Sequence, residues 1–216
     1  MKIYICGDST AASYTRDKAP QTGWGQALEE LNLLPGATIE NRAMAGRSTR
    51  TFLAEGRLTK IEQEIAPGDL LLIQFAHNDE SDKEERHTEP WGDFQDNLRV
   101  FLNTARGKGA IPVLVTPICM RIWQEGKLQD THGEYLQAMR AVAEEEKVPL
   151  IDMYRESWET VNRMGEEESK KLFLHLEAGV YPAFPEGRED DAHTRWAGAE
   201  AWARIAAQGL KNLGLG

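Results

Sequence analysis

Residues 69–75, with the sequence DLLLIQF, constrain the fold more than any other stretch of this chain. From Leu70 to Phe75 every residue except Gln74 is apolar, so polar and apolar positions do not alternate. A strand without such alternation is typically covered on both of its faces by other elements. The stretch therefore predicts a central strand of a parallel sheet that carries helices on both sides.

Strand-like and helix-like segments alternate along the rest of the chain. Short apolar runs predict strands at residues 3–6, 69–75, 112–116 and 148–152, and residues 38–41 are expected to form a further short strand. Apolar residues at helical spacing predict helices at residues 24–31, 94–105, 135–142 and 199–210. A further helix is predicted to open after Gly46, with its apolar stripe at residues 58–65. No hairpin turn signal separates the strands, so we expect one domain, residues 1–216, folded as a parallel α/β/α sandwich.

Composition and charge exclude several classes of protein. The chain is 41% hydrophobic, 28% charged and contains six Trp, which excludes a disordered chain. No apolar run approaches the roughly 20 residues of a membrane-spanning helix. The net charge of −10 disfavours nucleic acid and anionic membranes as partners. No signal segment precedes Lys2, so a cytoplasmic protein is expected; the oligomeric state stays open.

Ser9 is the candidate nucleophile, because it follows the first strand in the turn Gly7-Asp8-Ser9-Thr10. In an open parallel sheet, reactive groups gather outside the carboxyl ends of the strands. A serine after glycine is also a common helix cap or turn former. The hypothesis therefore depends on partners elsewhere in the chain.

Asp190 and His193 provide a base and a carboxylate to orient it. They lie where the unpatterned segment 176–191 ends and the last helix begins, three residues apart, so the carboxylate can hold the imidazole. Asp191 is the competing choice for the orienting carboxylate. Loops of this length inside compact domains are usually functional.

Gly46 and Asn78 are the candidate oxyanion donors beside the N–H of Ser9. Both follow predicted strands, so the backbone N–H of Gly46 and the side-chain amide of Asn78 should emerge at the same edge of the sheet. Either residue could instead serve only as a turn former. His77, next to Asn78, and His175, beside the long loop, are candidates for substrate contact.

Two other chemistries compete with this one. Cys6 and Cys119 end apolar strand-like runs without a nearby His in sequence, a pattern typical of buried free thiols. A metal site could form if His77, Asp79, His175, Asp190, Asp191 and His193 converged. No His-Glu-x-x-His or Cys-x-x-Cys pattern is present, so no metal is expected. The two remaining histidines, His87 and His132, lie in polar loops and are expected to be exposed.

The candidate residues together resemble a known family. Gly7-Asp8-Ser9, Gly46, Asn78 and Asp190-x-x-His193 occur in the order of the four motif blocks of SGNH (GDSL-type) hydrolases. Within that family the chain is most similar to rhamnogalacturonan acetylesterases, through Asn41-Arg42-Ala43, Gly46-Arg47-Ser48-Thr49, Gln74-Phe75, His77-Asn78-Asp79 and Asp191-Ala192-His193-Thr194. The resemblance implies a flavodoxin-like sandwich of five parallel strands. It also implies a serine carbohydrate esterase that removes acetyl groups from pectic rhamnogalacturonan, without a cofactor.

One position departs from the family pattern. The family usually has Gly two residues before the Asn of its third block, and this chain has Ala76 there. Alanine disfavours a positive φ, so a shift of the loop that carries Asn78 would follow.

Other functions on the same fold stay open at this point. One is an SGNH esterase that acts on acetylated xylan or other short acyl esters, and another is an inactive carbohydrate-binding protein. An acetylated oligosaccharide taken up by the cell is the expected partner of the esterase. Trp91, Trp123 and Tyr181, near predicted loops, are candidates either for stacking on sugars or for core packing.

Overall fold

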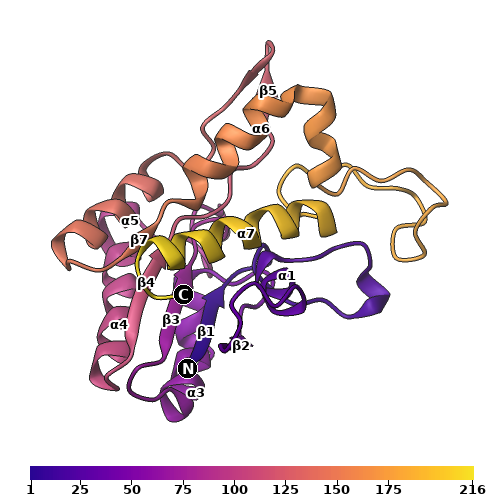
Figure 1. Cartoon of the computed structure of the whole chain (residues 1–216). Coiled ribbons are helices and arrows are strands. Elements are labelled where there is room, and N and C mark those ends of the chain that lie inside the picture. Colours follow the sequence, from indigo (N-terminus) through magenta and orange to yellow (C-terminus); the bar gives the residue numbers. More distant parts are fainter.

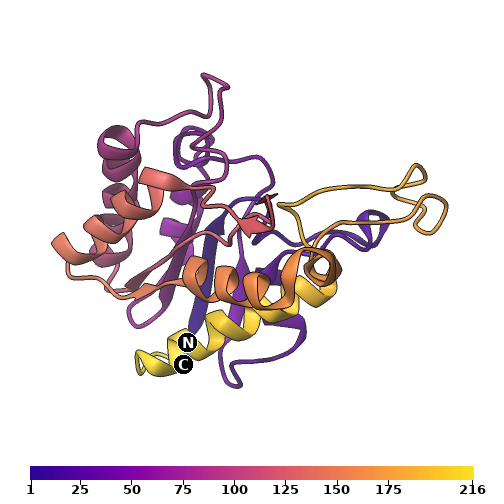
Figure 2. The same ribbon diagram turned by 90° about the horizontal axis from the view of Figure 1, so that it is seen from above.

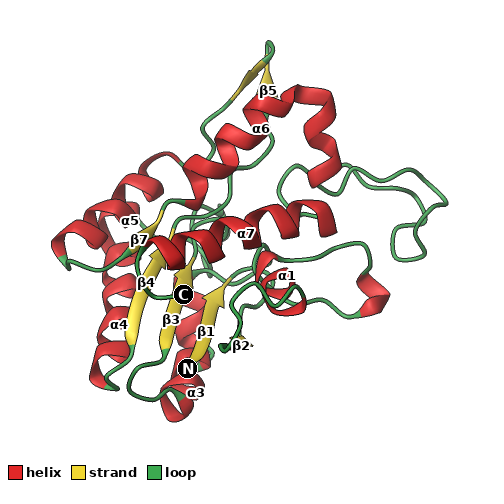
Figure 3. Ribbon diagram, viewed as in Figure 1, coloured by secondary structure: helices red, strands yellow, loops and turns green.

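A five-stranded parallel sheet forms the centre of the computed structural model, which describes all residues from Met1 to Gly216. Its strands are β1 (Lys2–Gly7), β2 (Thr38–Asn41), β3 (Leu70–Gln74), β4 (Ile111–Val115) and β7 (Leu150–Ile151). They lie side by side in the order β2-β1-β3-β4-β7 (Figure 3). Ile3 of β1 is in register with Ile39 on one side and Leu70 on the other. The prediction of a parallel α/β/α sandwich is confirmed.

Helices cover both faces of this sheet. One face carries α1 (Trp24–Glu30), α6 (Met153–Ser169) and α7 (Trp196–Asn212). The other face carries α2 (Thr49–Ala54), α3 (Arg57–Glu64), α4 (Gln95–Gly107) and α5 (Gly133–Glu145). Figures 1 and 2 show α7 running across its face of the sheet, with the two chain termini close together. No helix combines the length and the apolar character that crossing a membrane requires.

The apolar strands fill two separate cores. In β1, Ile3 and Ile5 belong to a cluster of 29 buried residues, whereas Tyr4 and Cys6 belong to a cluster of 22 on the opposite face. The strand β3 divides its side chains in the same way. Successive side chains of a strand point to opposite faces, so a continuously apolar strand supplies both cores.

Both cysteines lie inside these cores as free thiols. Burial raises the pKa of the Cys119 thiol to about 12, and burial also raises the pKa of the Cys6 thiol. A thiol that stays protonated is a poor nucleophile. The structure therefore disfavours cysteine chemistry.

The single helix predicted after Gly46 is in fact two helices. The chain breaks between α2 and α3 at Gly56, which has a φ of +65° and precedes the first residue of α3. Glycine adopts such a left-handed conformation at the lowest steric cost, so the chain can change direction here. The apolar stripe at residues 58–65 therefore belongs to α3 and its end alone.

Sequence analysis missed α6, which fills the region after β7. Asp152 caps this helix by accepting a hydrogen bond from the backbone N–H of Arg155 at 3.2 Å. Tyr154, Trp158 and Val161 pack against the core at helical spacing. Both signals are present in the sequence.

A short antiparallel hairpin, β5 (Trp123–Gln124) and β6 (Lys127–Leu128), was also not expected. Its turn residues Glu125 and Gly126 have φ values of +49° and +73°. Two successive positive φ angles are the signature of a tight hairpin turn. Glu at the first position hides the usual Asn-Gly or Asp-Gly signal.

The packing of α7 positions the segment just before it. A Cβ on Gly198 would lie 2.2 Å from the carbonyl oxygen of Leu172, so glycine alone allows α7 to lie this close to the chain there. Arg195 N–H donates to that same carbonyl at 3.2 Å. The end of the long loop 176–191 is thereby brought toward the carboxyl edge of the sheet. Figure 2 shows this loop projecting on the same side as the segment around Arg16–Lys18.

Candidate active site

A buried carboxylate holds the turn after β1. Asp8 is fully buried and accepts hydrogen bonds from the backbone N–H of Thr10 at 2.8 Å and from the Gln74 amide at 3.1 Å. Burial favours a raised pKa for Asp8, but the His77 ring at 3.3 Å and the bonds from Thr10 outweigh it and lower the pKa below its usual value. The polar Gln74 in an otherwise apolar strand is explained by this contact.

The backbone of Ser9 is fixed from a second side. The Tyr14 hydroxyl donates to the carbonyl oxygen of Ser9 at 2.7 Å, and the N–H of Trp24 donates to the carbonyl of Thr10 at 2.9 Å. Ser9 itself is 9% exposed. The backbone of Ser9 is therefore held by neighbouring segments, while a small part of the residue stays exposed.

The structure brings Ser9, His193 and Asp190 together. His193 Nε2 lies 2.9 Å from Ser9 Oγ, and His193 Nδ1 lies 2.9 Å from Asp190 Oδ2. A neutral imidazole that donates from Nδ1 to a carboxylate has an unprotonated Nε2, which can accept the serine proton. The arrangement can therefore activate a hydroxyl for attack on a carbonyl carbon.

Asp190 is strongly held as an anion. Its Oδ1 accepts the backbone N–H groups of Ala192 and His193 at 3.0 and 2.8 Å, and Arg188 lies 2.7 Å from Oδ2. Burial would raise the pKa of Asp190, but the hydrogen bonds and charge of His193, with help from Arg188, hold it far below its usual value. Asp190 thus stays ionised while it orients the imidazole.

Backbone pairing fixes the position of His193. Its carbonyl accepts the N–H of Leu174 at 3.0 Å, and the next residue, Thr194, pairs with Phe173 and accepts the N–H of Thr22 at 2.9 Å. The segment is thus held between two others that are distant in sequence. Such ladders position a base better than a free loop does.

Gly46 and Asn78 lie in two segments that Asp79 ties together. The buried Asp79 carboxylate accepts the N–H of Thr49 at 3.0 Å and the hydroxyl of Thr88 at 3.1 Å. The Asn78 amide donates one N–H to the carbonyl of Arg47 at 3.2 Å, which leaves its second N–H available. Gly46 has a φ of +78°, a conformation that favours glycine.

Ala76 adopts a positive φ despite its side chain. Its φ is +134° and it is fully buried in the core beside Phe75. The backbone of Ala76 therefore takes this conformation although alanine disfavours it, because the packed core holds the residue there. Strained residues of this kind cost about 1–3 kcal/mol and cluster near functional sites.

Two histidines differ from expectation because they are buried against each other. His77 is 8% exposed, lies 3.3 Å from Asp8 Oδ2 and packs edge-on to His132 at 4.5 Å between ring centres. Its contact with a substrate stays a prediction. His132, expected in an exposed loop, is buried because Glu80 and the carbonyl of Ile118 compensate its ring nitrogens at 3.1 and 2.9 Å. His87 is partly exposed.

Asp191, the competing orienter, bonds to other partners. Its carboxylate lies 2.7 Å from His175 Nε2 and 2.6 Å from Arg121 Nη1. Arg121 is 5% exposed and also donates to the carbonyl of Glu166 at 2.6 Å. It therefore anchors the end of the loop 176–191. Sequence analysis missed this role of Arg121, since no local pattern links it to Asp191.

The six candidate metal ligands do not form one cluster. They fall into separate groups: His77 with Asp8, His175 with Asp191, His193 with Asp190, and Asp79 with Thr49. No three His, Cys, Asp or Glu side chains converge as a metal site would require.

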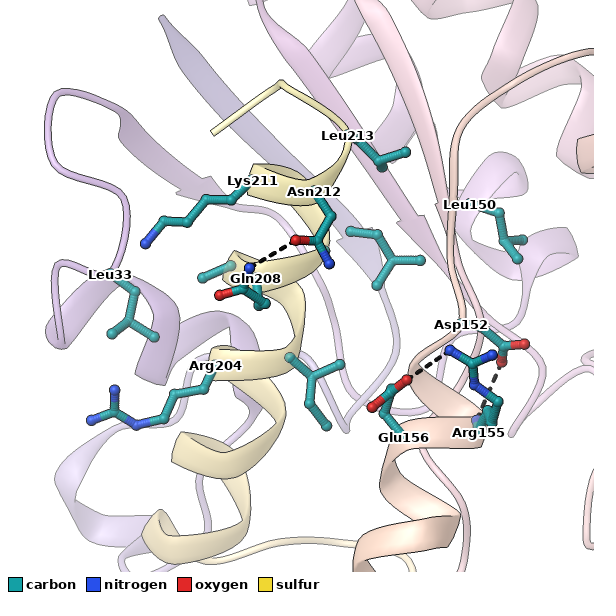
Figure 4. Close-up of a pocket in the computed structure, with 14 residues that line it drawn as sticks. Leu33, Leu150, Asp152, Arg155, Glu156, Arg204, Gln208, Lys211, Asn212 and Leu213 are labelled. Atoms are coloured by element: carbon teal, nitrogen blue, oxygen red, sulfur yellow. Dashed lines mark hydrogen bonds and ion pairs between the residues drawn. The ribbon is translucent and has the colours of Figure 1, made fainter.

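Two cavities lie outside the Ser9–His193–Asp190 group. One of about 660 Å³ lies among β7, the start of α6 and the end of α7, and none of the candidate site residues lines it (Figure 4). Some of its polar groups pair among themselves, as in Arg155–Glu156 at 2.7 Å and Gln208–Asn212 at 2.8 Å. The second of these is an ordinary i,i+4 pair of a helix surface.

The second cavity, about 510 Å³, lies beside the loop 176–191. His175 and Tyr181 line it, and so does Arg188, the partner of Asp190. Of the other aromatic candidates, Trp91 is 51% exposed, and Trp123 packs against the core. His175 and Tyr181 therefore remain the candidates that flank the site.

Comparison with known proteins gives a consistent pattern. The profile of the GDSL-like Lipase/Acylhydrolase family matches residues 5–182. The rhamnogalacturonan acetylesterase RhgT of Bacillus subtilis is 41% identical over 216 residues, which is 100% of this chain and 91% of that protein. The probable rhamnogalacturonan acetylesterase YesY of the same organism is 38% identical over 214 residues, with 99% of this chain and 94% of that protein covered.

Solved structures resemble this fold over its full length. The crystal structure of YxiM from Bacillus subtilis matches with a TM-score of 0.84 at 31% identity and covers 99% of this chain and 57% of that one. An acetylxylan esterase from Geobacillus stearothermophilus matches with a TM-score of 0.67 at 19% identity, over 97% of this chain and 93% of that one. At 19% identity the second likeness shows the fold alone.

Replacing Asp79 with Asn should change how stability depends on pH. Burial raises the pKa of Asp79 from 3.8 to about 7, against the hydrogen bonds from Thr49 and Thr88 that lower it. Between these two pH values the folded state holds more protons than the unfolded state. The free energy of unfolding of the wild type should therefore fall as the pH rises from about 4 to about 7 through this group.

Asp79→Asn keeps an acceptor at the position of Oδ1 and removes the titration. The free energy of unfolding of both proteins is measured by urea denaturation from pH 4 to pH 8. We expect the value for the wild type to fall relative to that of the variant as the pH rises, and the difference then to level off. Parallel curves for the two proteins would show that Asp79 does not titrate in this window.

Proposed function

The chain belongs to the GDSL-like lipase/acylhydrolase family, and on this basis we propose that it is a serine acetylesterase acting on acetylated pectic rhamnogalacturonan oligosaccharides. Its relatives show that it is a carboxylic ester hydrolase. The observation that carries the proposed mechanism is the unbroken hydrogen-bonded series Ser9–His193–Asp190. The pectic substrate is supported by the 41% identity to a rhamnogalacturonan acetylesterase along the entire chain.

In the first step, His193 Nε2 takes the proton of Ser9 Oγ as the oxygen attacks the acetyl carbonyl carbon. The imidazolium that forms is stabilised by Asp190, which remains ionised. The tetrahedral intermediate then collapses, and its bond to the sugar oxygen breaks. His193 donates its proton to that oxygen, and the acetyl group stays on Ser9.

In the second step, water replaces the sugar. His193 takes a proton from the water, the water oxygen attacks the acetyl carbon, and the bond to Ser9 Oγ breaks. The proton returns from His193 to Ser9, and acetate leaves. One water is consumed for each acetate and each free sugar hydroxyl produced, so no cofactor is needed for the balance.

The developing oxyanion has three donors in this proposal. They are the backbone N–H groups of Ser9 and Gly46 and the second N–H of the Asn78 amide, whose first N–H is used on Arg47. Donors fixed before the reaction stabilise the transition state without reorganisation. The ties through Asp79 and Asp8 supply that rigidity.

Replacing Ser9 with Ala should abolish acetate release. Because Ala has no nucleophile, we expect a loss of at least about 10³-fold in kcat on acetylated rhamnogalacturonan oligosaccharides. Ser13→Ala is the matched control, since Ser13 lies exposed in the same loop and only accepts a hydrogen bond from Asn41. Acetate is measured enzymatically, with acetylated xylo-oligosaccharides assayed in parallel.

The outcomes separate chemistry from substrate. Faster release from the pectic substrate, lost in Ser9→Ala and kept in Ser13→Ala, supports both parts of the proposal. Equal release by wild type and Ser9→Ala would remove Ser9 from the mechanism. Release that is confined to xylo-oligosaccharides would leave the chemistry and overturn the substrate.

Replacing Asn78 with Ala should lower kcat far more than it raises KM. The loss of one oxyanion donor costs about 10²–10³-fold in turnover, because the donor acts mainly on the transition state. Asn103→Ala, an exposed position on α4, is the control for a generic Asn replacement. An unchanged kcat in a folded Asn78→Ala protein would remove Asn78 from the oxyanion donors.

A further inference from the structure

Arg86 lies beside two of the proposed oxyanion donors. Its Nη1 donates to the side-chain oxygen of Asn78 at 3.3 Å, and its Nη2 lies 3.3 Å from the position that a Cβ on Gly46 would occupy. The side chain of Arg86 is half-buried. The guanidinium group therefore lies at the rim of the candidate active site, above the backbone of Gly46.

Arg86 forms no ion pair, although acidic residues surround it in sequence. The loop 80–90 contains five carboxylates: Glu80, Asp82, Glu84, Glu85 and Glu89. Two of them pair with histidines instead, Glu80 with His132 and Glu89 with His87. A guanidinium has five N–H donors, and Arg86 uses one of them on Asn78. Its remaining donors are left at the rim without a partner from this chain.

Two other arginines near the site are already neutralised. Arg188 lies 2.7 Å from Asp190, and Arg47 lies 2.9 Å from Glu55. Arg86 is thus a cation of this region that is free to meet a charged ligand. A chain with a net charge of −10 repels a polyanion at long range, so an acidic substrate needs a local cation where it binds.

We propose that Arg86 binds the carboxylate of a uronate unit of the substrate and thereby selects acidic over neutral acetylated glycans. This inference rests on the proposed function, because the galacturonate units of rhamnogalacturonan carry such carboxylates. The planar guanidinium can donate two parallel hydrogen bonds to a carboxylate. A neutral xylan unit has no carboxylate to accept them. Arg86 then sets specificity, whereas Ser9 and His193 carry out the reaction.

The test uses inhibition, so that it does not depend on turnover of a glycan. Hydrolysis of 4-nitrophenyl acetate, a neutral ester, is measured with increasing concentrations of unacetylated oligogalacturonate or of neutral xylo-oligosaccharide. The variants are Arg86→Gln, which removes the charge, and Arg86→Lys, which keeps the charge but loses the planar fork. Lys83→Gln is the matched control, since it removes an exposed cation from the same loop.

We expect oligogalacturonate to inhibit the wild type competitively, and salt to weaken that inhibition. In Arg86→Gln the inhibition constant should rise about tenfold or more, beyond any change in hydrolysis of the neutral ester. The inhibition constant of Arg86→Lys should lie between those of the wild type and Arg86→Gln. The inhibition constant of Lys83→Gln should equal that of the wild type. Inhibition by xylo-oligosaccharide should be the same in all four proteins.

Two results would overturn the inference. An inhibition constant for oligogalacturonate that is the same in wild type and Arg86→Gln means that Arg86 does not bind the uronate. If Arg86→Gln loses hydrolysis of the neutral ester and inhibition by both glycans to the same extent, Arg86 acts only by positioning Asn78. Failure of the proposed function looks different: no acetate is released from rhamnogalacturonan, while inhibition by oligogalacturonate still depends on Arg86.

Discussion

The hydrogen bond between Ser9 Oγ and His193 Nε2 joins residues 184 positions apart, and much of the structure serves to make it possible. Ser9 is positioned by the first strand and by the buried Asp8 carboxylate. His193 is positioned by the pairing of its neighbour Thr194 with Phe173 and Thr22. The closeness of α7 to Leu172, which Gly198 permits, brings these two arrangements to the same edge of the sheet.

Three carboxylates at this edge differ in charge because their partners differ. Desolvation acts on all of them in the same direction, toward a raised pKa. Asp8 and Asp190 have nearby imidazoles and backbone donors that outweigh it, so both stay anionic. Asp79 has only threonine donors and lies near the Asp8 anion, so desolvation dominates. Asp190 is thus the anion that orients His193, whereas the main contribution of the Asp79 carboxyl group is to join two loops.

Local patterns in the sequence predicted the parts of the structure that depend on local physics. Four of the five strands follow from apolar runs, and Asp190 and His193 follow from their spacing at a loop end. The contacts that join distant segments had no such signal. Examples are Arg121 with Asp191, His77 with Asp8, and Arg86 with Gly46. The burial of His132 was missed for the same reason, because its polar neighbours in sequence do not show that Glu80 compensates it. The helix α6 is a different case, since its cap at Asp152 and its apolar spacing were present in the sequence.

The covalent acetyl-enzyme at Ser9 is the claim on which the mechanism depends, and mass spectrometry tests it most directly. The protein is mixed with 4-nitrophenyl acetate, quenched in acid during the first turnovers and digested, and the peptides are mapped. The mechanism predicts one added acetyl group on the peptide that contains Ser9, in wild type and not in Ser9→Ala. Full turnover without any acetylated peptide, or with the acetyl group on another residue, would contradict it.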